Sequence, residues 1–403
     1  MSNYVVVIDP GHGSMEYPGG QYDGYVEKDI DLVVASVMKD RLEKYDGVTV
    51  YMTRYDDSNV ELHDRAKVAK NCNADLFVSI HFNTSATHST YGSELWIPAQ
   101  NKYYNKVFPL ANEMMKNFEA VGLHNRGIKT KLNSAGTDNY YAVLKDSTDY
   151  GIPSILVEHC HLDNPFDTFA IPIYDTQAYL NNLNNFGVMD ADAVAKYLHL
   201  KSTSLGLDYS NYKLAKSNVK TKLISQDYTA PESCEVSLIS TNVADQTISV
   251  NIKAKDTNGF IQYYQYSVDG GAHWSYLQDW PRTAWNKSAE NCQATIKVKP
   301  GAPTSLIVFV YNGYDLVTAS NVLAVPALTG APAPESEITI NKTAYQEFSG
   351  ISYGTLERNS TSHPLDLVGG EMMLTFAGAL AGLTLAASIL LAYIKHRFSN
   401  EKK

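Results

Sequence analysis

Side chains that could bind a metal ion or move a proton stand beside short apolar stretches of this sequence. His12 lies in a Pro-Gly-His-Gly turn after residues 4–9, and His81 and Glu158 each follow a mainly apolar run. Glu27 directly precedes an amphipathic segment. Two histidines and one glutamate around an open position form a ligand set of zinc hydrolases, and a further carboxylate would act as general base.

Each of these residues also has an ordinary structural explanation. A lone histidine in a chain of 403 residues is more often structural than a metal ligand. An acid at the start of a helix, as Glu27 would be, is favoured by the helix dipole. Only the combination of all four residues, brought together by a fold, points to a metal hydrolase.

Residues 1–200 alternate strand-like and helix-like patterns. This predicts an α/β domain with a mostly parallel or mixed sheet flanked by helices. Strands are expected at 4–9, 48–53, 75–80, 91–97 and 153–157, and helices at 28–45, 60–72, 101–121 and 176–198, with Gly187 as a candidate break. Because the ends of parallel strands meet at one edge of a sheet, the candidate residues would lie there together.

The pattern changes after a polar linker predicted at 201–230. Residues 231–326 show short alternating stretches separated by turn signals, which predicts an immunoglobulin-like or fibronectin-like β-sandwich, interpreted as a spacer domain. Cys234 and Cys292 fall in this region, and the sequence leaves open whether they form a disulfide. The chain has only four cysteines and no CxxC pair, which argues against a zinc knuckle.

The end of the sequence predicts attachment to a membrane. Residues 327–370 resemble a flexible spacer, 371–394 a transmembrane helix, and 395–403 a basic cytoplasmic tail. We therefore expect a single-pass protein of the cell membrane with its first domain outside. The first residues do not resemble a signal peptide, so the opposite orientation stays open. The net charge of −10 argues against nucleic acid as a partner.

A series of short motifs runs through the first domain in a fixed order: Val7–Gly13, Glu27–Asp29, Leu62–Ala66, Ala74–Asn83, Gly92–Leu95, Asn125–Lys129 and Ile155–Glu158. In this order they resemble the zinc-dependent N-acetylmuramoyl-L-alanine amidases of bacterial cell-wall hydrolysis, the Amidase_3 family. The resemblance implies that His12, Glu27 and His81 bind Zn²⁺ and that Glu158 is the catalytic carboxylate. It implies peptidoglycan as substrate, cut between N-acetylmuramic acid and L-alanine.

The sequence departs from the family pattern at two places. Ser14 stands where a further glycine is common, and His159-Cys160-His161 follows Glu158 where a Gly-Phe-Leu-type stretch is frequent. A second metal site or a substrate contact at these histidines stays open beside the simpler interpretation that they line a pocket. No histidine–asparagine pattern supports Cys160 as a nucleophile.

Three further residues are candidates for holding the substrate: Asn83, Arg126 and His161. Arginine suits bidentate recognition of a carboxylate, although a structural role for Arg126 is equally open. Two other functions also stay open, namely a surface protein that binds the cell wall or acts in adhesion without catalysis, and a metallohydrolase of another amide.

Overall fold

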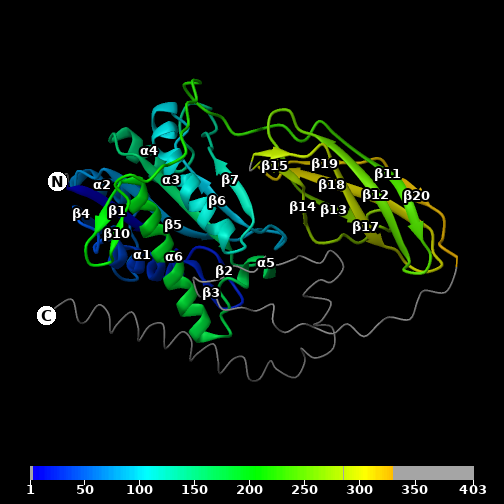
Figure 1. Ribbon diagram of the computed structural model, residues 1–403, viewed down its shortest axis with the longest axis horizontal. Coiled ribbons are helices and arrows are strands. Elements are labelled where there is room, and N and C mark those ends of the chain that lie inside the picture. Colours follow the sequence, from blue (N-terminus) through cyan, green and yellow to red (C-terminus); the bar gives the residue numbers. More distant parts are fainter. Residues whose placement is uncertain (1–2, 285, 330–403) are drawn as a thin grey trace. The chain divides into compact units, whose positions relative to one another are not determined.

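The computed structural model describes residues 3–284 and 286–329, which divide into two compact units at the boundary between Ser225 and Gln226 (Figure 1). Within these ranges no helix is long and apolar enough to cross a membrane. The predicted transmembrane helix 371–394, the tail 395–403 and nearly all of the predicted spacer lie outside the described residues.

The first unit is built on a six-stranded sheet. Its strand order is β4 (Val48–Met52), β1 (Tyr4–Pro10), β5 (Leu76–Asn83), β8 (Ser154–His161), β6 (Ser93–Trp96) and β7 (Asn125–Lys129). Strand β6 runs antiparallel to β8, whereas the other neighbouring pairs are parallel. The central strands are almost wholly buried, and their first halves are mainly apolar, as expected for a sheet covered on both faces.

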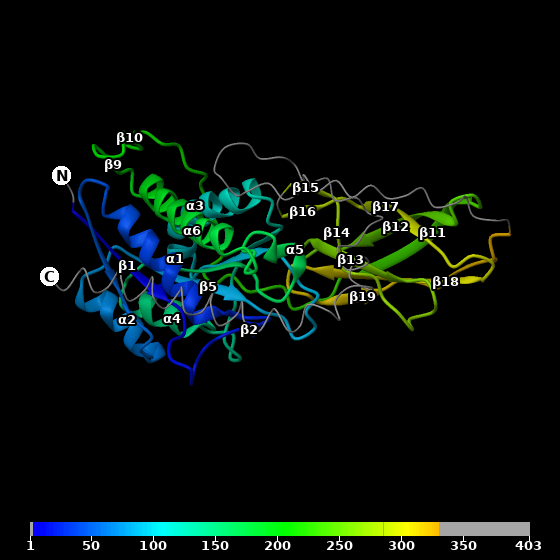
Figure 2. The ribbon, with the colours of Figure 1, turned by 90° about the horizontal axis from the view of Figure 1, so that it is seen from below.

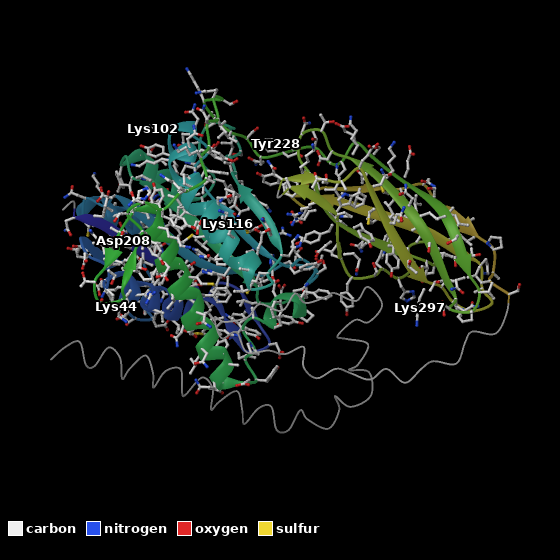
Figure 3. The ribbon with its side chains drawn as sticks, viewed as in Figure 1. Lys44, Lys102, Lys116, Asp208, Tyr228 and Lys297 are labelled. Atoms are coloured by element: carbon white, nitrogen blue, oxygen red, sulfur yellow. The ribbon has the colours of Figure 1, made fainter. Side chains whose placement is uncertain are left out.

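Helices cover both faces of this sheet (Figure 2). One face carries α1 (Glu27–Leu42), α3 (Asn101–Ala120) and α6 (Thr176–Tyr197), and the other carries α2 (Leu62–Asn71) and α4 (Ala142–Asp149). The short helix α5 (Pro165–Thr168) follows β8, and a small hairpin of β2 (Gln21–Tyr22) and β3 (Tyr25–Val26) leads into α1. The predicted mixed α/β fold is therefore confirmed. Lys44, Lys102 and Asp208 are exposed on the outside of this unit (Figure 3).

Helix α6 has no break at Gly187, which corrects that expectation. A Cβ atom added at Gly187 would lie 2.6 Å from the carbonyl oxygen of Val34 and 2.7 Å from Cβ of Val37, both on α1. The glycine therefore serves the close approach of two packed helices, and tertiary packing outweighs its low helix propensity.

Much of the predicted linker 201–230 also needs correction, because residues up to Ser225 belong to the first unit. Strands β9 (Lys201–Ser202) and β10 (Leu207–Asp208) form a hairpin. Further on, the side-chain amide of Asn105 bonds both the backbone N–H and the carbonyl of Val219, each at 2.9 Å. The polar composition of this segment predicted a linker, whereas hydrogen bonds attach it to α3 of the first unit.

The second unit consists of antiparallel strands. One sheet has the order β11 (Ser233–Asn242), β12 (Thr247–Lys255) and β17 (Asn291–Lys297). The other contains β14 (Gln278–Asp279), β13 (Ile261–Ser267), β18 (Thr304–Asn312) and β19 (Val317–Ala319), with β20 (Leu323–Val325) also paired to β18. Strands β15 (Arg282–Ala284) and β16 (Lys287–Ser288) form a separate hairpin.

Both large sheets of the second unit contribute to one apolar core, which includes Val250 and Ile252 from β12 and Val308 from β18. Cys234 and Cys292 lie in this core as free thiols rather than as a disulfide. A β-rich second unit is thus confirmed, whereas its immunoglobulin-like character stays a prediction.

Candidate metal centre

Three chain segments meet at one edge of the first unit. Strands β1 and β5 pair in parallel, with Pro10 opposite Ile80, so the chain leaves β1 beside the end of β5. His12 follows in a turn with φ of +57°. The β2–β3 hairpin then returns the chain, so that Glu27 becomes the first residue of α1.

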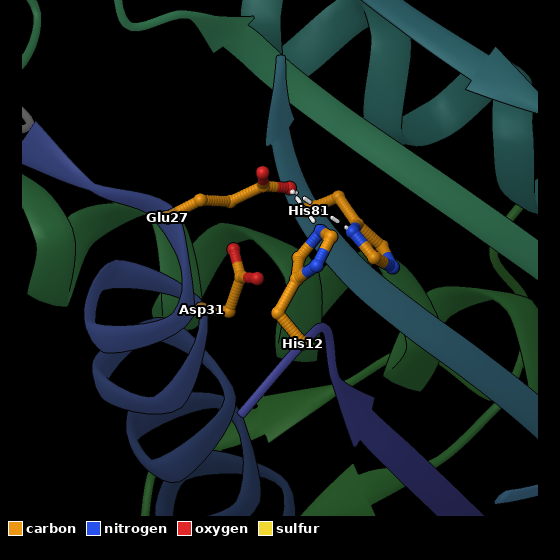
Figure 4. A group of neighbouring side chains, drawn as sticks. All are labelled: His12, Glu27, Asp31 and His81. Carbon is orange, nitrogen blue, oxygen red and sulfur yellow. Dashed lines mark hydrogen bonds and ion pairs between the residues drawn. The ribbon is translucent and has the colours of Figure 1, made fainter. Parts of the chain in front are cut away.

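The predicted ligands His12, Glu27 and His81 lie in contact with one another (Figure 4). Oε1 of Glu27 is 3.1 Å from Nε2 of His12 and 3.1 Å from Nδ1 of His81. The two imidazole rings meet edge to face, with their centroids 5.1 Å apart. The other carboxylate oxygen of Glu27 accepts a hydrogen bond from the backbone N–H of Gly20 at 2.6 Å.

Asp31 is a fourth member of this group that the sequence analysis missed. One ligand atom from each of His12, Glu27, Asp31 and His81 can be chosen so that all lie within 4.8 Å of one another. Asp31 is fully buried, and neither of its carboxylate oxygens has a hydrogen-bond partner among the described residues. The sequence did contain a signal for Asp31, because Glu27 and Asp31 are four residues apart and residues at this spacing share one face of a helix.

Glycines at nearby positions leave the space that the four side chains of this group fill. A Cβ atom on Gly11 would lie 2.5 Å from Nδ1 of His81 and 2.7 Å from Oδ2 of Asp31. At Gly19, where φ is +74°, it would lie 2.4 Å from Oε2 of Glu27. The Pro-Gly-His-Gly turn therefore serves close approach as much as backbone freedom.

A second layer of hydrogen bonds determines how His81 is oriented. The Ser79 hydroxyl donates to Oδ2 of Asp9 at 2.7 Å, because a carboxylate can only accept. Its oxygen lies 3.0 Å from Nε2 of His81 and accepts the N–H there. This pattern assigns the ring proton to Nε2 and leaves the lone pair of Nδ1 directed at the other ligands.

The protonation preferences of the group suit a cation. Burial alone would raise the pKa of Glu27, but the neighbouring imidazoles, His12 first among them, lower it to about 2. Burial lowers the pKa of His81, which favours the neutral ring that metal binding requires. Burial, followed by the negative charge of Glu27, raises the pKa of Asp31 well above its ordinary value.

Glu158 lies beside this group without belonging to it. On β8 it is the register partner of His81 on one side and of Glu94 on the other. Its Oε2 atom is buried and has no hydrogen-bond partner among the described residues. Burial, then the negative charges of Glu27 and Glu94, raise the pKa of Glu158 well above its ordinary value.

Arg126 and Asn83, two of the predicted substrate contacts, bond a buried glutamate. Nε of Arg126 is 2.9 Å from Oε2 of Glu94, and Nζ of Lys129 is 2.7 Å from the same oxygen. Asn83 donates to Oε1 of Glu94 at 3.1 Å. Arg126 is only 2% exposed, so its charge is matched inside the protein. Substrate binding by these residues stays a prediction.

The histidines after Glu158 are directed into the protein. His161 is buried, and its Nδ1 lies 3.1 Å from the carbonyl oxygen of Gly92. His159 lies between the carbonyl oxygen of His81, at 3.0 Å, and Oδ2 of Asp190, at 2.8 Å. Neither joins the group around Glu27, which is the one metal-type cluster found within residues 3–284 and 286–329.

The fold and this centre define an α/β domain with a candidate metal site at the edge of its sheet. Residues 6–183 match the model of the N-acetylmuramoyl-L-alanine amidase family. The chain is 31% identical over 163 residues to N-acetylmuramoyl-L-alanine amidase LytC of Bacillus subtilis, covering 40% of this chain and 30% of LytC. It is 29% identical over 202 residues to the sporulation-specific N-acetylmuramoyl-L-alanine amidase of the same organism, covering 49% of this chain and 70% of that protein.

A solved structure shows a similar match. The catalytic domain of CwlV, an N-acetylmuramoyl-L-alanine amidase from Bacillus (Paenibacillus) polymyxa var. colistinus, is 30% identical. The match covers 49% of this chain and 99% of that one, with a TM-score of 0.40. Residues 6–183 belong to the N-acetylmuramoyl-L-alanine amidase family. The family match lies in the first half of the chain, and the chain spans less than a third of LytC.

Proposed function

We propose that this protein hydrolyses the amide bond between N-acetylmuramic acid and L-alanine in peptidoglycan. In this proposal His12, Glu27 and His81 hold a zinc ion, and Glu158 is the general base. The observation that carries it is the convergence of the three ligands beside an unpartnered glutamate, in a chain of the amidase family. Its relatives LytC and the sporulation-specific enzyme are named for this activity.

The residues present fit a divalent metal ion. Two imidazole nitrogens and a carboxylate are donors that suit zinc. The lone pair of His81 Nδ1 faces a carboxylate oxygen of Glu27 at 3.1 Å, an arrangement that is repulsive unless a cation or a proton lies between them. When bound, the ion would supply Lewis acidity toward water and the scissile carbonyl.

Glu158 would handle the proton in the reaction. Its raised pKa makes the carboxylate a stronger base toward water, and the protonated form that results can serve as an acid. It would accept a proton from the attacking water as the new carbon–oxygen bond forms. It would then donate that proton to the amine of L-alanine as the carbon–nitrogen bond breaks.

Purified cell-wall sacculi provide the test. The full chain, supplied with Zn²⁺, is expected to release stem peptides that carry new L-alanine amino termini, and a chelator should stop their release. New glycan reducing ends, or amino termini of other residues only, would contradict the proposed bond. Hydrolysis of unrelated N-acyl amides without release from sacculi would instead support a metallohydrolase of another amide.

We also propose that the protein acts from outside the cell membrane. This proposal draws on the apolar run at 371–394 and the basic tail after it, and not on the described structure. Protease added to intact cells should remove the β-rich unit, and protection of that unit would reverse the orientation.

A further inference from the structure

Asp31 is a buried acid without a partner. It lies one turn after Glu27 on the same face of α1 and is fully buried, and its carboxylate forms no hydrogen bond with any described residue. An ionised carboxylate in such a place is costly unless a positive charge accompanies it. The role of Asp31 therefore depends on which cation could reach it.

The buried arginine nearby, Arg54, attracts Asp31 electrostatically but donates no hydrogen bond to it. The Arg54 guanidinium donates to the carbonyl oxygens of Pro10 at 3.1 Å, Gly11 at 2.6 Å and Lys28 at 2.7 Å. Through these bonds Arg54 holds the backbone around the centre in place. Both carboxylate oxygens of Asp31 remain without a hydrogen-bond donor among the described residues. What Asp31 does face is the ligand group, within 4.8 Å.

We propose that Asp31 is a fourth metal ligand, a second carboxylate that donates one oxygen to the ion held by His12, Glu27 and His81. The proposal rests on the metal dependence proposed above and adds a residue to it. Two carboxylates with two neutral imidazoles balance the charge of a divalent cation. This also enriches the donor set in oxygen, which widens the range of ions that the site accepts toward Co²⁺ and Mn²⁺.

Metal binding by the full chain tests the assignment without using activity. Zn²⁺ and Co²⁺ affinities are measured by competition with a chromophoric chelator for wild type, Asp31→Asn and Asp31→Ala. Asp40→Asn, nine residues further along the same helix, is the matched control. Both Asp31 variants should bind at least tenfold more weakly and change the visible spectrum of bound Co²⁺, while Asp40→Asn keeps both. Affinities within twofold of wild type and an unchanged spectrum would overturn the assignment.

Thermal unfolding separates a ligand from a packing residue. Without metal, Asp31→Asn should melt at or above wild type because it loses a buried unpaired acid. With Zn²⁺ or Co²⁺, its gain in melting temperature should be smaller than that of wild type. A lower melting temperature without metal, together with an undiminished gain, would mean that Asp31 has a packing role and would overturn the proposal.

The assay on sacculi, run on the same preparations, keeps the two proposals apart. If wild type hydrolyses sacculi and Asp31→Asn binds metal as tightly as wild type does, only the Asp31 assignment is overturned. Wild type that binds metal more tightly than Asp31→Asn but releases no stem peptide would overturn the amidase function alone. Wild type that binds neither Zn²⁺ nor Co²⁺ would overturn the Asp31 assignment together with metal dependence.

Discussion

Ser79 Oγ lies 3.0 Å from Nε2 of His81, the ligand that it orients, which stands two residues further along the same strand. The same hydroxyl donates to Asp9, which is itself paired with Arg65 at 2.9 Å. The chain from Arg65 through Asp9 and Ser79 thus fixes which nitrogen of His81 faces the centre. Ser79 is a positioning residue, because it acts through His81.

Ser79→Ala should therefore weaken Zn²⁺ binding about tenfold or more, the usual effect of losing an outer partner of a ligand. Nitrogen NMR of the metal-free protein should show His81 shifting from the Nε2–H form toward a mixture of tautomers. Ser147→Ala is the control, because Ser147 is buried and its hydroxyl has no partner within the described residues. An unchanged tautomer and affinity in Ser79→Ala would remove Ser79 from the site.

Glu158→Gln should keep metal binding and lose catalysis. Removing a general base lowers the rate by about 10²–10⁴-fold, and glutamine preserves the shape of the side chain. Release of stem peptides from sacculi and Zn²⁺ affinity are measured on the same sample, with the exposed Glu61→Gln as control. Unchanged release would refute the catalytic assignment, and a large loss of affinity would make Glu158 a metal ligand instead.

Gly11→Ala should impair the metal site sterically. The added methyl group would lie 2.3 Å from Cε1 of His81, so the ring or the turn must move. We expect at least tenfold weaker Zn²⁺ binding. Gly136→Ala is the comparison, because its methyl group meets nothing within 4 Å and its φ of +68° costs about 1–2 kcal/mol of stability only. Equal metal affinity in the two variants would show that the space at Gly11 is not needed.

Glu94→Gln should destabilise the first unit, because it leaves Arg126 and Lys129 buried without their carboxylate. Breaking a buried ion pair typically costs about 3–5 kcal/mol. Burial alone would raise the pKa of Glu94, but Lys129, Arg126 and His161 hold it well below the ordinary value of 4.5. The stabilisation is therefore complete above about pH 4.5 and is lost as the pH falls below it.

Urea unfolding at several pH values checks this sign. The difference in free energy of unfolding between wild type and Glu94→Gln should be largest near pH 7 and should decrease below pH 4.5. Glu61→Gln should stay as stable as wild type at every pH. A difference in unfolding free energy that does not change with pH would show that it does not come from the charge of Glu94.

Much of the first unit could be predicted from the sequence because its signals are local. Apolar runs marked β1, β5 and β8, and helical spacing marked α1 and α6. Strand β7 was missed because Asn-Arg-Gly-Ile-Lys has the composition of a loop, and Arg126 and Lys129 are buried there only because Glu94 comes from β6 to meet them. A local pattern contains no record of a partner more than 30 residues away.

The same division holds for the candidate site. The sequence by itself determined that His12, Glu27, His81 and Glu158 stand at the ends of elements, and its motifs indicated the amidase family. Only the tertiary structure decided that Asp31 faces the same point as the first three and that Arg126 is turned inward to Glu94. The physical reason is that position along a strand or helix is local, whereas convergence depends on how β1, β5 and α1 pack against one another.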